Sequence, residues 1–305
     1  MKKSNWKIED INDLSGKYII VTGANSGIGF EASKVLASKG AKIIMGVRSI
    51  ERGIKAKEDI LSVFPNSDID VLKLDLMDSV SIKRFADKYL TKYNKIDILL
   101  NNAGIMTVPY GRTKDGFEQQ IGVNHLGHFA LTGLLLDMLK KSKSRIVNVA
   151  SIAHRYGKIN TNSFIYQEGN KYNKAKAYSQ SKLANLLFTY KLSRMLQDEG
   201  KDMVVVAAHP GVSRTNLGRH IDGSRIMRLS NPIVSLLDQD QEAGALSLIM
   251  ACTDLDAKTG TYYGPDGFFT TKGNPFVTKS NKLSHNHELQ DHLFSVSEEL
   301  TKVKY

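Results

Sequence analysis

The sequence contains a single cysteine, Cys252, so the chain can form neither an intrachain disulfide nor a cluster of thiolate metal ligands. It also lacks any run of about 18 apolar residues, the length that a helix needs to cross a bilayer. The first ten residues, Met1 to Asp10, include basic side chains but no apolar segment of the kind found in signal peptides. Together these absences predict a cytoplasmic protein without a membrane span.

No block of five or six like charges occurs, although 42 Lys and Arg outnumber 31 Asp and Glu and give a formal net charge of +11. Such an excess of positive charge can favour the binding of nucleic acid, an acidic membrane surface or an anionic small molecule. The basic residues are spread along the whole chain, without a basic stripe or an aromatic platform. We therefore expect no nucleic-acid partner, because solvated surfaces and a phosphate-bearing ligand account for the charge equally well.

Short apolar runs rich in β-branched residues alternate with longer amphipathic segments along the chain. The runs predict strands at 18–22, 42–47, 70–74, 96–100, 145–150 and 203–208. Helices are expected after Gly27 to about Gly40, and near 50–63, 79–92, 118–140, 173–199, 239–252 and 287–300. This alternation is typical of an α/β protein with a doubly wound parallel sheet, and no repeat or linker divides it. We expect one domain over residues 1–305.

Two stretches interrupt the alternation, at 155–172 and at 211–235. The second follows a Pro210-Gly211 turn and mixes apolar residues with basic and polar ones. We expect residues 211–235 to form a small lid over an apolar substrate. Near the C-terminus, residues 264–267 (Gly-Pro-Asp-Gly) predict a turn.

A glycine-rich turn joins the first expected strand to the first helix. It reads Gly23-Ala24-Asn25-Ser26-Gly27-Ile28-Gly29. Glycine lets the backbone come close to an anion, and a helix N-terminus adds unpaired N–H groups and a positive dipole. Many strand-to-helix turns need glycine only for a positive φ. With a strand before and a helix after, the pattern favours a dinucleotide site.

The end of the second expected strand indicates which dinucleotide binds. Where an acidic residue would bind the ribose 2′-hydroxyl of NAD, the chain has Val47 followed by Arg48 and Ser49. Because Arg48 can pair with a 2′-phosphate, the sequence favours NADP(H), the alternative being an ordinary surface arginine. After the third strand, Asp75 and Leu76 could flank the adenine, although the nearby Asp78-Ser79 also reads as a helix cap.

Tyr178 and Lys182 stand four residues apart in the expected helix 173–199, so both side chains project from one helix face. An ammonium group beside a phenol lowers the pKa of the phenol and prepares it to exchange a proton with an alcohol oxygen. An isolated Tyr-x-x-x-Lys is more often a solvated helix face. Its meaning depends on the other motifs.

In order and spacing, these motifs resemble the short-chain dehydrogenase/reductase family over nearly the whole chain. They are Thr22-Gly23-x-x-x-Gly27-x-Gly29, Asn101-Asn102-Ala103-Gly104, Asn124 within Val123–Phe129, Ser151, Tyr178-x-x-x-Lys182 and Pro210-Gly211-x-x-x-Thr215. The details look most similar to the retinol-dehydrogenase-like and protochlorophyllide-reductase-like branch. Ser151 and Tyr178 are further apart than is usual in the family, through an insert that this branch commonly has. The resemblance implies a Rossmann fold.

The resemblance also implies roles for individual residues. Tyr178 would be the general acid or base, and Lys182 would lower its pKa and bind the nicotinamide ribose. Ser151 would hold the substrate oxygen, and Asn124 would fix a water that links Lys182 to solvent. The ribose side and the nicotinamide end would be lined by Asn102, Ala103, Gly104, Pro210, Gly211 and Thr215.

The implied activity is NADP(H)-dependent interconversion of an alcohol and a carbonyl compound, on a moderately apolar small molecule. Two alternatives stay open: a reductase of C=C bonds, and a catalytically idle NADP-binding regulator. Family members are commonly dimers or tetramers that associate through the helices at 118–140 and 173–199, so the resemblance implies a homo-oligomer.

Three histidines allow more than one interpretation. His125 and His128 lie three apart on an expected helix, but with no third ligand in view we expect packing or hydrogen bonding and no metal site. His154 follows the strand that ends at Ser151 and could either contact substrate or support the structure.

Overall fold

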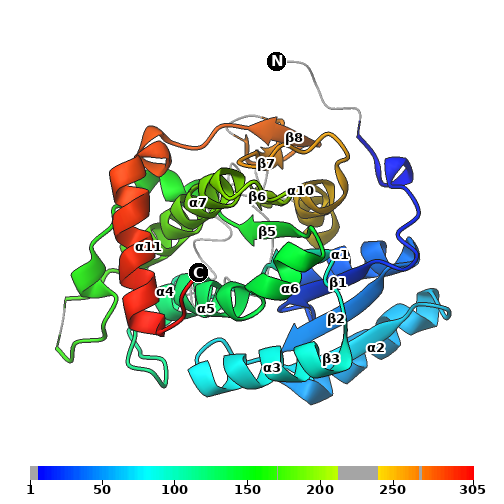
Figure 1. Ribbon diagram of the computed structural model, residues 1–305, viewed down its shortest axis with the longest axis horizontal. Helices are drawn as coiled ribbons and strands as arrows, with labels where there is room; N and C mark the ends of the chain where they lie inside the picture. The colour runs from blue at the N-terminus through cyan, green and yellow to red at the C-terminus, as the bar shows by residue number, and fades with distance from the viewer. Residues whose placement is uncertain (1–5, 170, 212–239, 268–269) are drawn as a thin grey trace, which may run out of the picture.

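The apolar runs of the sequence form one eight-stranded sheet in the computed structural model, which describes residues 6–169, 171–211, 240–267 and 270–305. The strand order is β3-β2-β1-β4-β5-β6-β7-β8, with helices on both faces (Figure 1). The strands are β1 Tyr18–Thr22, β2 Lys42–Val47, β3 Ile69–Lys73, β4 Ile98–Asn101, β5 Arg145–Val149, β6 Val204–Ala208, β7 Tyr262–Pro265 and β8 Pro275–Thr278.

All neighbouring strands are parallel except β7 and β8, which are antiparallel. Strand β1 lies between β2 and β4, with Ile20 opposite Ile44 on one side and Leu99 on the other. The chain therefore winds outward from β1 first in one direction and then in the other. In such sheets a ligand cleft opens at the carboxyl ends of the strands, where the direction reverses.

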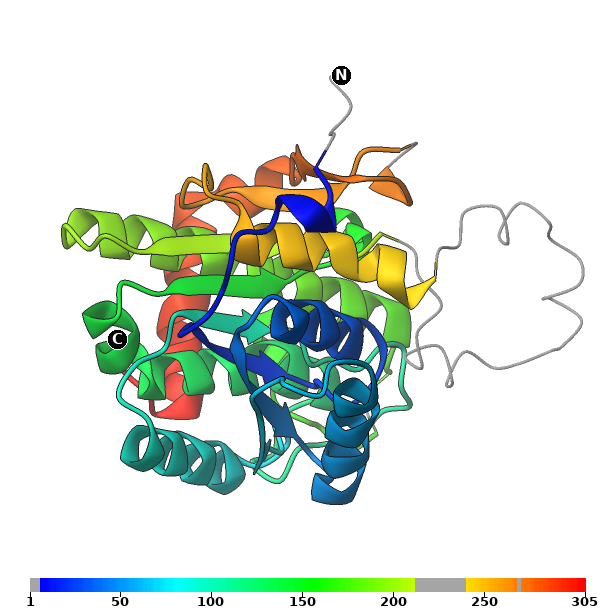
Figure 2. The same cartoon turned by 90° about the vertical axis from the view of Figure 1, so that its right-hand side faces the viewer.

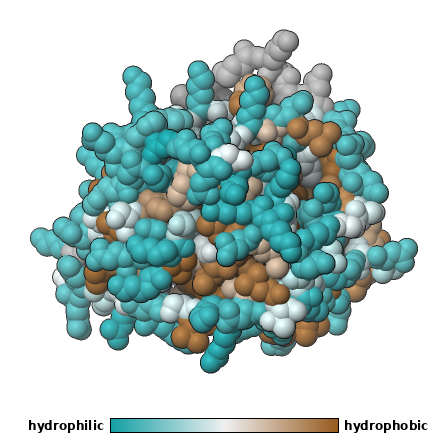
Figure 3. All heavy atoms as spheres, viewed as in Figure 1, coloured by the Kyte–Doolittle hydropathy of each residue, from teal (hydrophilic) through white to brown (hydrophobic). Residues whose placement is uncertain are grey.

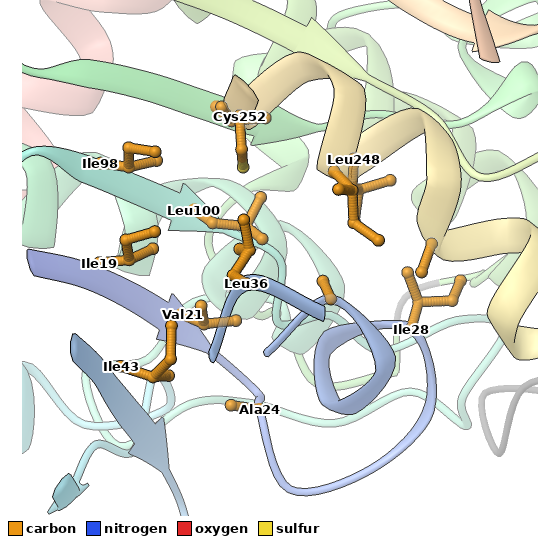
Figure 4. Packing of buried hydrophobic residues seen from close by; sticks show 14 of the residues in the cluster. Ile19, Val21, Ala24, Ile28, Leu36, Ile43, Ile98, Leu100, Leu248 and Cys252 are labelled. Carbon is orange, nitrogen blue, oxygen red and sulfur yellow. The ribbon is translucent and has the colours of Figure 1, made fainter. Parts of the chain in front are cut away.

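Helices cover the two faces of the sheet in separate layers (Figures 1 and 2). Helices α1 (Gly27–Ser38), α2 (Ile50–Val63) and α10 (Gln241–Thr253) share one core, and α3 (Ser79–Lys92), α5 (Gly127–Leu134) and α7 (Lys174–Asp198) share the other. Successive strand residues alternate between the two cores, as the pleat requires. Figure 4 shows the first core around Leu36 of α1 and Leu248 of α10, packed against Ile19, Val21 and Leu100.

The expected helix at 118–140 is wrong as a single element. It is divided into α4 (Gln119–Ile121), a π-helical turn η2 (Gly122–Leu126), α5, and α6 (Leu136–Lys141). Gly127 allows close packing here, because a Cβ on it would lie 3.0 Å from the carbonyl oxygen of Leu76. A π-helical turn inserts a residue into a helix and re-aims the side chains around it.

The tail also differs from the prediction. Tyr262–Pro265 is strand β7, which pairs with β6 through Ala207 opposite Tyr262, so the expected turn at 264–267 begins inside a strand. Glycine and proline have a low strand propensity, so this run does not look like a strand in the sequence despite its two tyrosines. Pairing with β6 overrides that low propensity in the structure. The last helix is α11 (His287–Thr301), close to its expected bounds.

Short 3₁₀ helices lie at Ile8–Asp10 (η1), Ile152–Tyr156 (η3), Thr161–Ser163 (η4) and Lys282–His285 (η7). The expected lid, apart from Gly211, and Thr215 lie outside the described residues. No helix in the described part of the chain has both the length and the apolar character to cross a membrane.

Candidate active site

A cleft of about 340 Å³ lies at the carboxyl ends of the parallel strands, a size typical of ligand sites. It brings together these residues expected from the sequence: Gly23, Asn25, Ser26, Gly27, Ile28, Gly29, Arg48, Ser49, Asp75, Leu76, Asn102, Ala103, Gly104, Tyr178, Lys182 and Pro210. Further lining residues not expected from the sequence are Gly46, Arg52, Leu74, Met77, Ile105, Val123, Val149 and Ala150. Asn124, Ser151 and Gly211 are not part of the lining.

The glycine-rich turn at the start of α1 leaves room for a ligand and for the neighbouring loop. A Cβ on Gly29 would collide with the Asn102 side-chain amide and lie 2.7 Å from the Gly23 carbonyl oxygen. Gly23 itself has φ of +68°. Ser26, the N-cap residue, makes no side-chain hydrogen bond to the first turn of α1. The N–H groups of that turn therefore have no side-chain cap and are available to an anion.

Two arginines line the cleft where β2 meets α2. Arg48 follows β2, and Arg52 lies one turn into α2, whose N-cap Ser49 accepts a hydrogen bond from the Arg52 N–H at 3.3 Å. Arg52 is not among the residues expected from the sequence, although its spacing of four from Arg48 is a usable signal. Two guanidinium groups in one corner suit a phosphate.

Asp75 and Leu76 line the cleft after β3, and Asp78 caps α3 by accepting from the N–H groups of Val80 and Ser81 at 3.0 and 3.3 Å. The two interpretations of this stretch are therefore compatible. The cap fixes the start of α3, and the residues just before it form the cleft wall.

Thr22, at the end of β1, connects the loop after β4 to the π-helical turn. Its hydroxyl accepts the N–H groups of Asn102 and Ala103, both at 2.9 Å, and lies 2.9 Å from His128 Nε2. With both acceptor positions used, the hydroxyl donates its proton to Nε2. The ring proton of neutral His128 is then on Nδ1, which donates to the Asn124 carbonyl at 3.1 Å. Burial lowers the pKa of His128 to about 4, so the ring is neutral at physiological pH.

The side chain of Asn124 holds the loop after β4 by a two-point clamp. Its Oδ1 accepts the Ile105 N–H at 2.8 Å, and its Nδ2 donates to the Ile105 carbonyl at 2.9 Å and to Ser181 Oγ at 2.9 Å. Both amide protons are therefore used. Nearby, a Cβ on Gly104 would lie 3.2 Å from Asn124 Oδ1 and 3.6 Å from Lys182 Nζ, so these two polar atoms flank one glycine.

Tyr178 and Lys182 share one face of α7, as the sequence predicts. Lys182 is 4% exposed, its Nζ donates to the Val149 carbonyl at 3.0 Å and it lies 5.8 Å from the centre of the Tyr178 ring. Burial lowers the pKa of Lys182 to about 8. Burial also raises the pKa of Tyr178, while a hydrogen bond with Ser151 acts in the opposite direction. The predicted lowering of the Tyr178 pKa by Lys182 is therefore wrong here, because desolvation of the phenol dominates.

Ser151 begins the 3₁₀ turn η3, and its Oγ accepts the Ala153 N–H at 3.2 Å. His154 supports this turn from behind. Its Nε2 accepts the Asn281 N–H at 3.2 Å, so its Nδ1 carries the proton and donates to the Ser151 carbonyl at 2.6 Å. Both ring nitrogens are used and His154 is 1% exposed, which favours the structural interpretation of this residue.

His125 and His128 bond to hydroxyl groups of the protein. His125 Nε2 lies 2.8 Å from Ser297 Oγ, and His128 Nε2 accepts from Thr22 as described. Within the described ranges, no three His, Cys, Asp or Glu residues gather in a way that could hold a metal ion.

Comparison with known proteins agrees with this geometry. Residues 17–225 match the protein-family model described as short chain dehydrogenase. Human retinol dehydrogenase 13 is 45% identical over 256 residues, which cover 82% of this chain and 76% of that protein. The chloroplastic short-chain dehydrogenase TIC 32 B of Brassica napus is 39% identical over 265 residues, covering 84% and 83%.

A crystal structure of an uncharacterized protein from Mycobacterium paratuberculosis has the same fold over 99% of both chains, with a TM-score of 0.82 and 36% sequence identity. The family model spans more than half of the chain, and the human relative shares nearly half of its residues over most of it. The protein is therefore an oxidoreductase of the short-chain dehydrogenase/reductase family, in its retinol-dehydrogenase-like branch.

Proposed function

We propose that the protein is an NADP(H)-dependent oxidoreductase that interconverts an alcohol and a carbonyl compound, with Tyr178 as general acid and base. One observation carries the proposal. Tyr178 and Lys182 line the same cleft as the glycine-rich turn, and Ser151 is close enough to Tyr178 to lower the pKa of its hydroxyl by hydrogen bonding, against the effect of burial. A proton donor, a buried cation and a hydroxyl donor therefore meet at one end of a site with a phosphate cradle at the other.

The residues of the cleft fit a nicotinamide dinucleotide, which supplies the hydride when it is bound. The uncapped N-terminus of α1 suits the diphosphate, and the crowded position of Gly29 leaves no room for a side chain there. Arg48, Ser49 and Arg52 suit a 2′-phosphate. Adenine, ribose and nicotinamide would lie along Asp75, Leu76, Asn102, Ala103, Gly104 and Pro210.

The chain's own groups handle the proton and the charge. In the reduction direction the Tyr178 hydroxyl donates its proton to the carbonyl oxygen, while Ser151 donates a hydrogen bond to that oxygen as negative charge develops on it. Lys182, whose Nζ lies beside Gly104 at this end of the cleft, binds the nicotinamide ribose. Asn124 holds the loop that carries Ile105 against this site. In the oxidation direction the same groups take the proton back.

The substrate class rests on the relatives. Several are named retinol dehydrogenases, which supports a moderately apolar alcohol or aldehyde as the substrate of this chain. The cytoplasmic location remains a prediction from the sequence.

The decisive experiment is a panel of apolar aldehydes, ketones, secondary alcohols and α,β-unsaturated carbonyls, followed at the nicotinamide absorbance with NADPH and with NADH. We expect turnover of carbonyl compounds or alcohols and a preference for the phosphorylated cofactor. Reduction confined to the C=C bond would favour the alternative reductase, and tight NADPH binding without turnover would favour the idle regulator.

Tyr178→Phe identifies the proton donor. We expect this variant to lose turnover while NADPH binding changes by no more than a few-fold, since only the hydroxyl is removed. Tyr18→Phe, at the amino end of β1 and therefore at the opposite edge of the sheet, is the matched control and should keep full activity. Near-normal turnover by Tyr178→Phe would refute the assignment.

A further inference from the structure

We propose that the outer face of α5 and α7 is closed by the chain's own C-terminal segment, α11 with residues 302–305, and that the protein is active as a monomer. The family resemblance implies subunits that associate through the segments containing these two helices. In the structure α11 packs against both helices, and Figure 1 shows it upright at the left-hand side of the molecule, beside α7 and α5. This arrangement leaves that face without access for a second copy.

The contact is a cluster of buried aromatic rings. Phe294 of α11 lies 5.1 Å from Phe129 of α5 and 6.2 Å from Phe188 of α7, as measured between ring centres. Tyr305 lies 4.8 Å from Phe129, and its hydroxyl donates to the Phe129 carbonyl at 2.7 Å. Phe129 is 1% exposed and Phe188 is 3% exposed. These separations lie in the range of favourable aromatic pairs, and the burial of both rings shows that the segment excludes water from them.

A glycine in α5 allows residues 303–305 to pack directly against the helix backbone. A Cβ on Gly133 would lie 2.5 Å from Val303 Cγ1 and 2.8 Å from Tyr305 Cε2. Any other residue at Gly133 would push the end of the chain away. The absence of a side chain at this position is thus explained by residues 303–305 of the same chain.

Some polar groups also pair across the contact. Ser297 Oγ donates to the Leu293 carbonyl at 2.8 Å, so it accepts from His125 Nε2, which lies 2.8 Å away and carries the ring proton. At the edge, Asp291 pairs with Lys191 and Arg194 of α7, both at 2.7 Å. His125 belongs to the π-helical turn that carries Asn124, so α11 also supports the site from behind.

The outer side of α11 does not offer another surface on which a second copy of the chain could associate. Its exposed residues are polar or charged: His287, Glu288, Asp291, His292, Ser295 and Glu299. Figure 3, drawn from the viewpoint of Figure 1, shows hydrophilic residues over most of that face with hydrophobic patches between them. A stable subunit interface usually has a larger apolar centre with fewer charges.

The first test is the mass of the full chain in solution, by sedimentation velocity or light scattering at the concentrations used for activity assays. We expect one species near 33.9 kDa. A dimer, whether formed by exchange of α11 between two copies or through any other face, overturns the proposal. This measurement needs no substrate, so its result is independent of the proposed enzymatic function.

A pair of variants on α11 tests the contact itself. Phe294→Asp places a charge in the aromatic cluster, and we expect a lower thermal midpoint and a mass that grows with protein concentration, since Phe129 and Phe188 become exposed. Ser295→Asp, on the exposed side of the same turn, should change neither. An unchanged midpoint and mass for Phe294→Asp would contradict the proposal, as would a change of mass for Ser295→Asp. If Phe294→Asp does not fold, the mass of the unmodified chain still shows whether the protein is a monomer.

Discussion

The Thr22 hydroxyl and His128 Nε2 lie 2.9 Å apart, although 106 residues separate them in the sequence. Through this bond the end of β1, the loop after β4 and the π-helical turn share one hydrogen-bonded centre. The loop after β4 lines the proposed ribose site, and the π-helical turn carries Asn124. The proposed cofactor site and the segment that carries Asn124 therefore both depend on the position of one buried ring, that of His128.

Replacing His128 tests this coupling. His128→Leu removes both ring hydrogen bonds and leaves the Thr22 proton only the Leu100 carbonyl, 3.5 Å away. We expect kcat to fall by about tenfold to a hundredfold, because small displacements of reacting groups are costly, while the KM for NADPH changes less. Steady-state kinetics with the best substrate of the panel give both parameters.

His128→Asn is the conservative control. The amide nitrogen of asparagine can replace Nδ1 as the donor to the Asn124 carbonyl, so this variant should recover part of the lost kcat. Equal loss in both variants, with an equal fall in thermal midpoint, would mean that the ring only fills space.

Gly29→Ala tests the phosphate cradle. The added methyl would collide with the Asn102 amide, which donates to the Thr22 carbonyl at 2.8 Å, and with the Gly23 carbonyl. Because both neighbours are fixed, we expect NADPH binding, measured by fluorescence titration, to weaken by about tenfold or more.

Gly116→Ala is the matched control for Gly29→Ala. Gly116 also has a constrained backbone, with φ of +85°, but a Cβ there meets nothing within 4 Å. This variant should lose some stability and keep its NADPH affinity. If both variants bind NADPH like the unmodified chain, the glycine-rich turn is not the diphosphate site.

Most of the sheet and the phosphate cradle could be predicted because their signals are local. Strand β2 and helices α2 and α3 have the expected bounds, since apolar alternation and caps such as Ser49 and Asp78 mark them within a few residues. The spacing of Tyr178 and Lys182 likewise places both side chains on one face of α7.

The remaining features depend on contacts between distant segments. The π-helical turn, strand β7 and the docking of α11 arise from packing that no short pattern encodes. The direction of the Tyr178 pKa was predicted wrongly for the same reason. A spacing of four residues reveals the nearby cation, whereas the burial of the phenol follows only from the assembled fold.

Arg48→Asp tests the choice of cofactor. The substitution removes a guanidinium from the corner that would hold the 2′-phosphate and adds a repelling charge. We expect affinity for NADPH to fall by about a hundredfold while affinity for NADH changes far less. Arg84→Asp, an exposed arginine on α3, makes the same charge change elsewhere and should affect neither. Equal losses for both cofactors in Arg48→Asp would remove the NADP(H) assignment.

Buried histidines make stability depend on pH in a window above the range where most carboxylates titrate. Burial lowers the pKa of His128 and His154 to about 4 and that of His125 and His209 to about 3. Each group has an ordinary pKa near 6.5 in the unfolded chain. As the pH falls below that value, the unfolded chain takes up protons that the folded protein refuses, so stability must fall.

Each of these groups should cost about 1 kcal/mol one pH unit below 6.5, and the four act in the same direction. Glu118 has the opposite effect on stability: burial raises its pKa, so the folded protein takes up this proton more readily than the unfolded chain as the pH falls. This effect comes from one group only. Urea unfolding at about pH 7.5 and about pH 5.5 should therefore show a clear fall in the free energy of unfolding, and His154→Gln should reduce the difference between the two values. Equal free energies at the two pH values would show that these rings already accept protons in the folded protein, and the neutral tautomers that hold Asn124 and Ser151 in place could then not be correct.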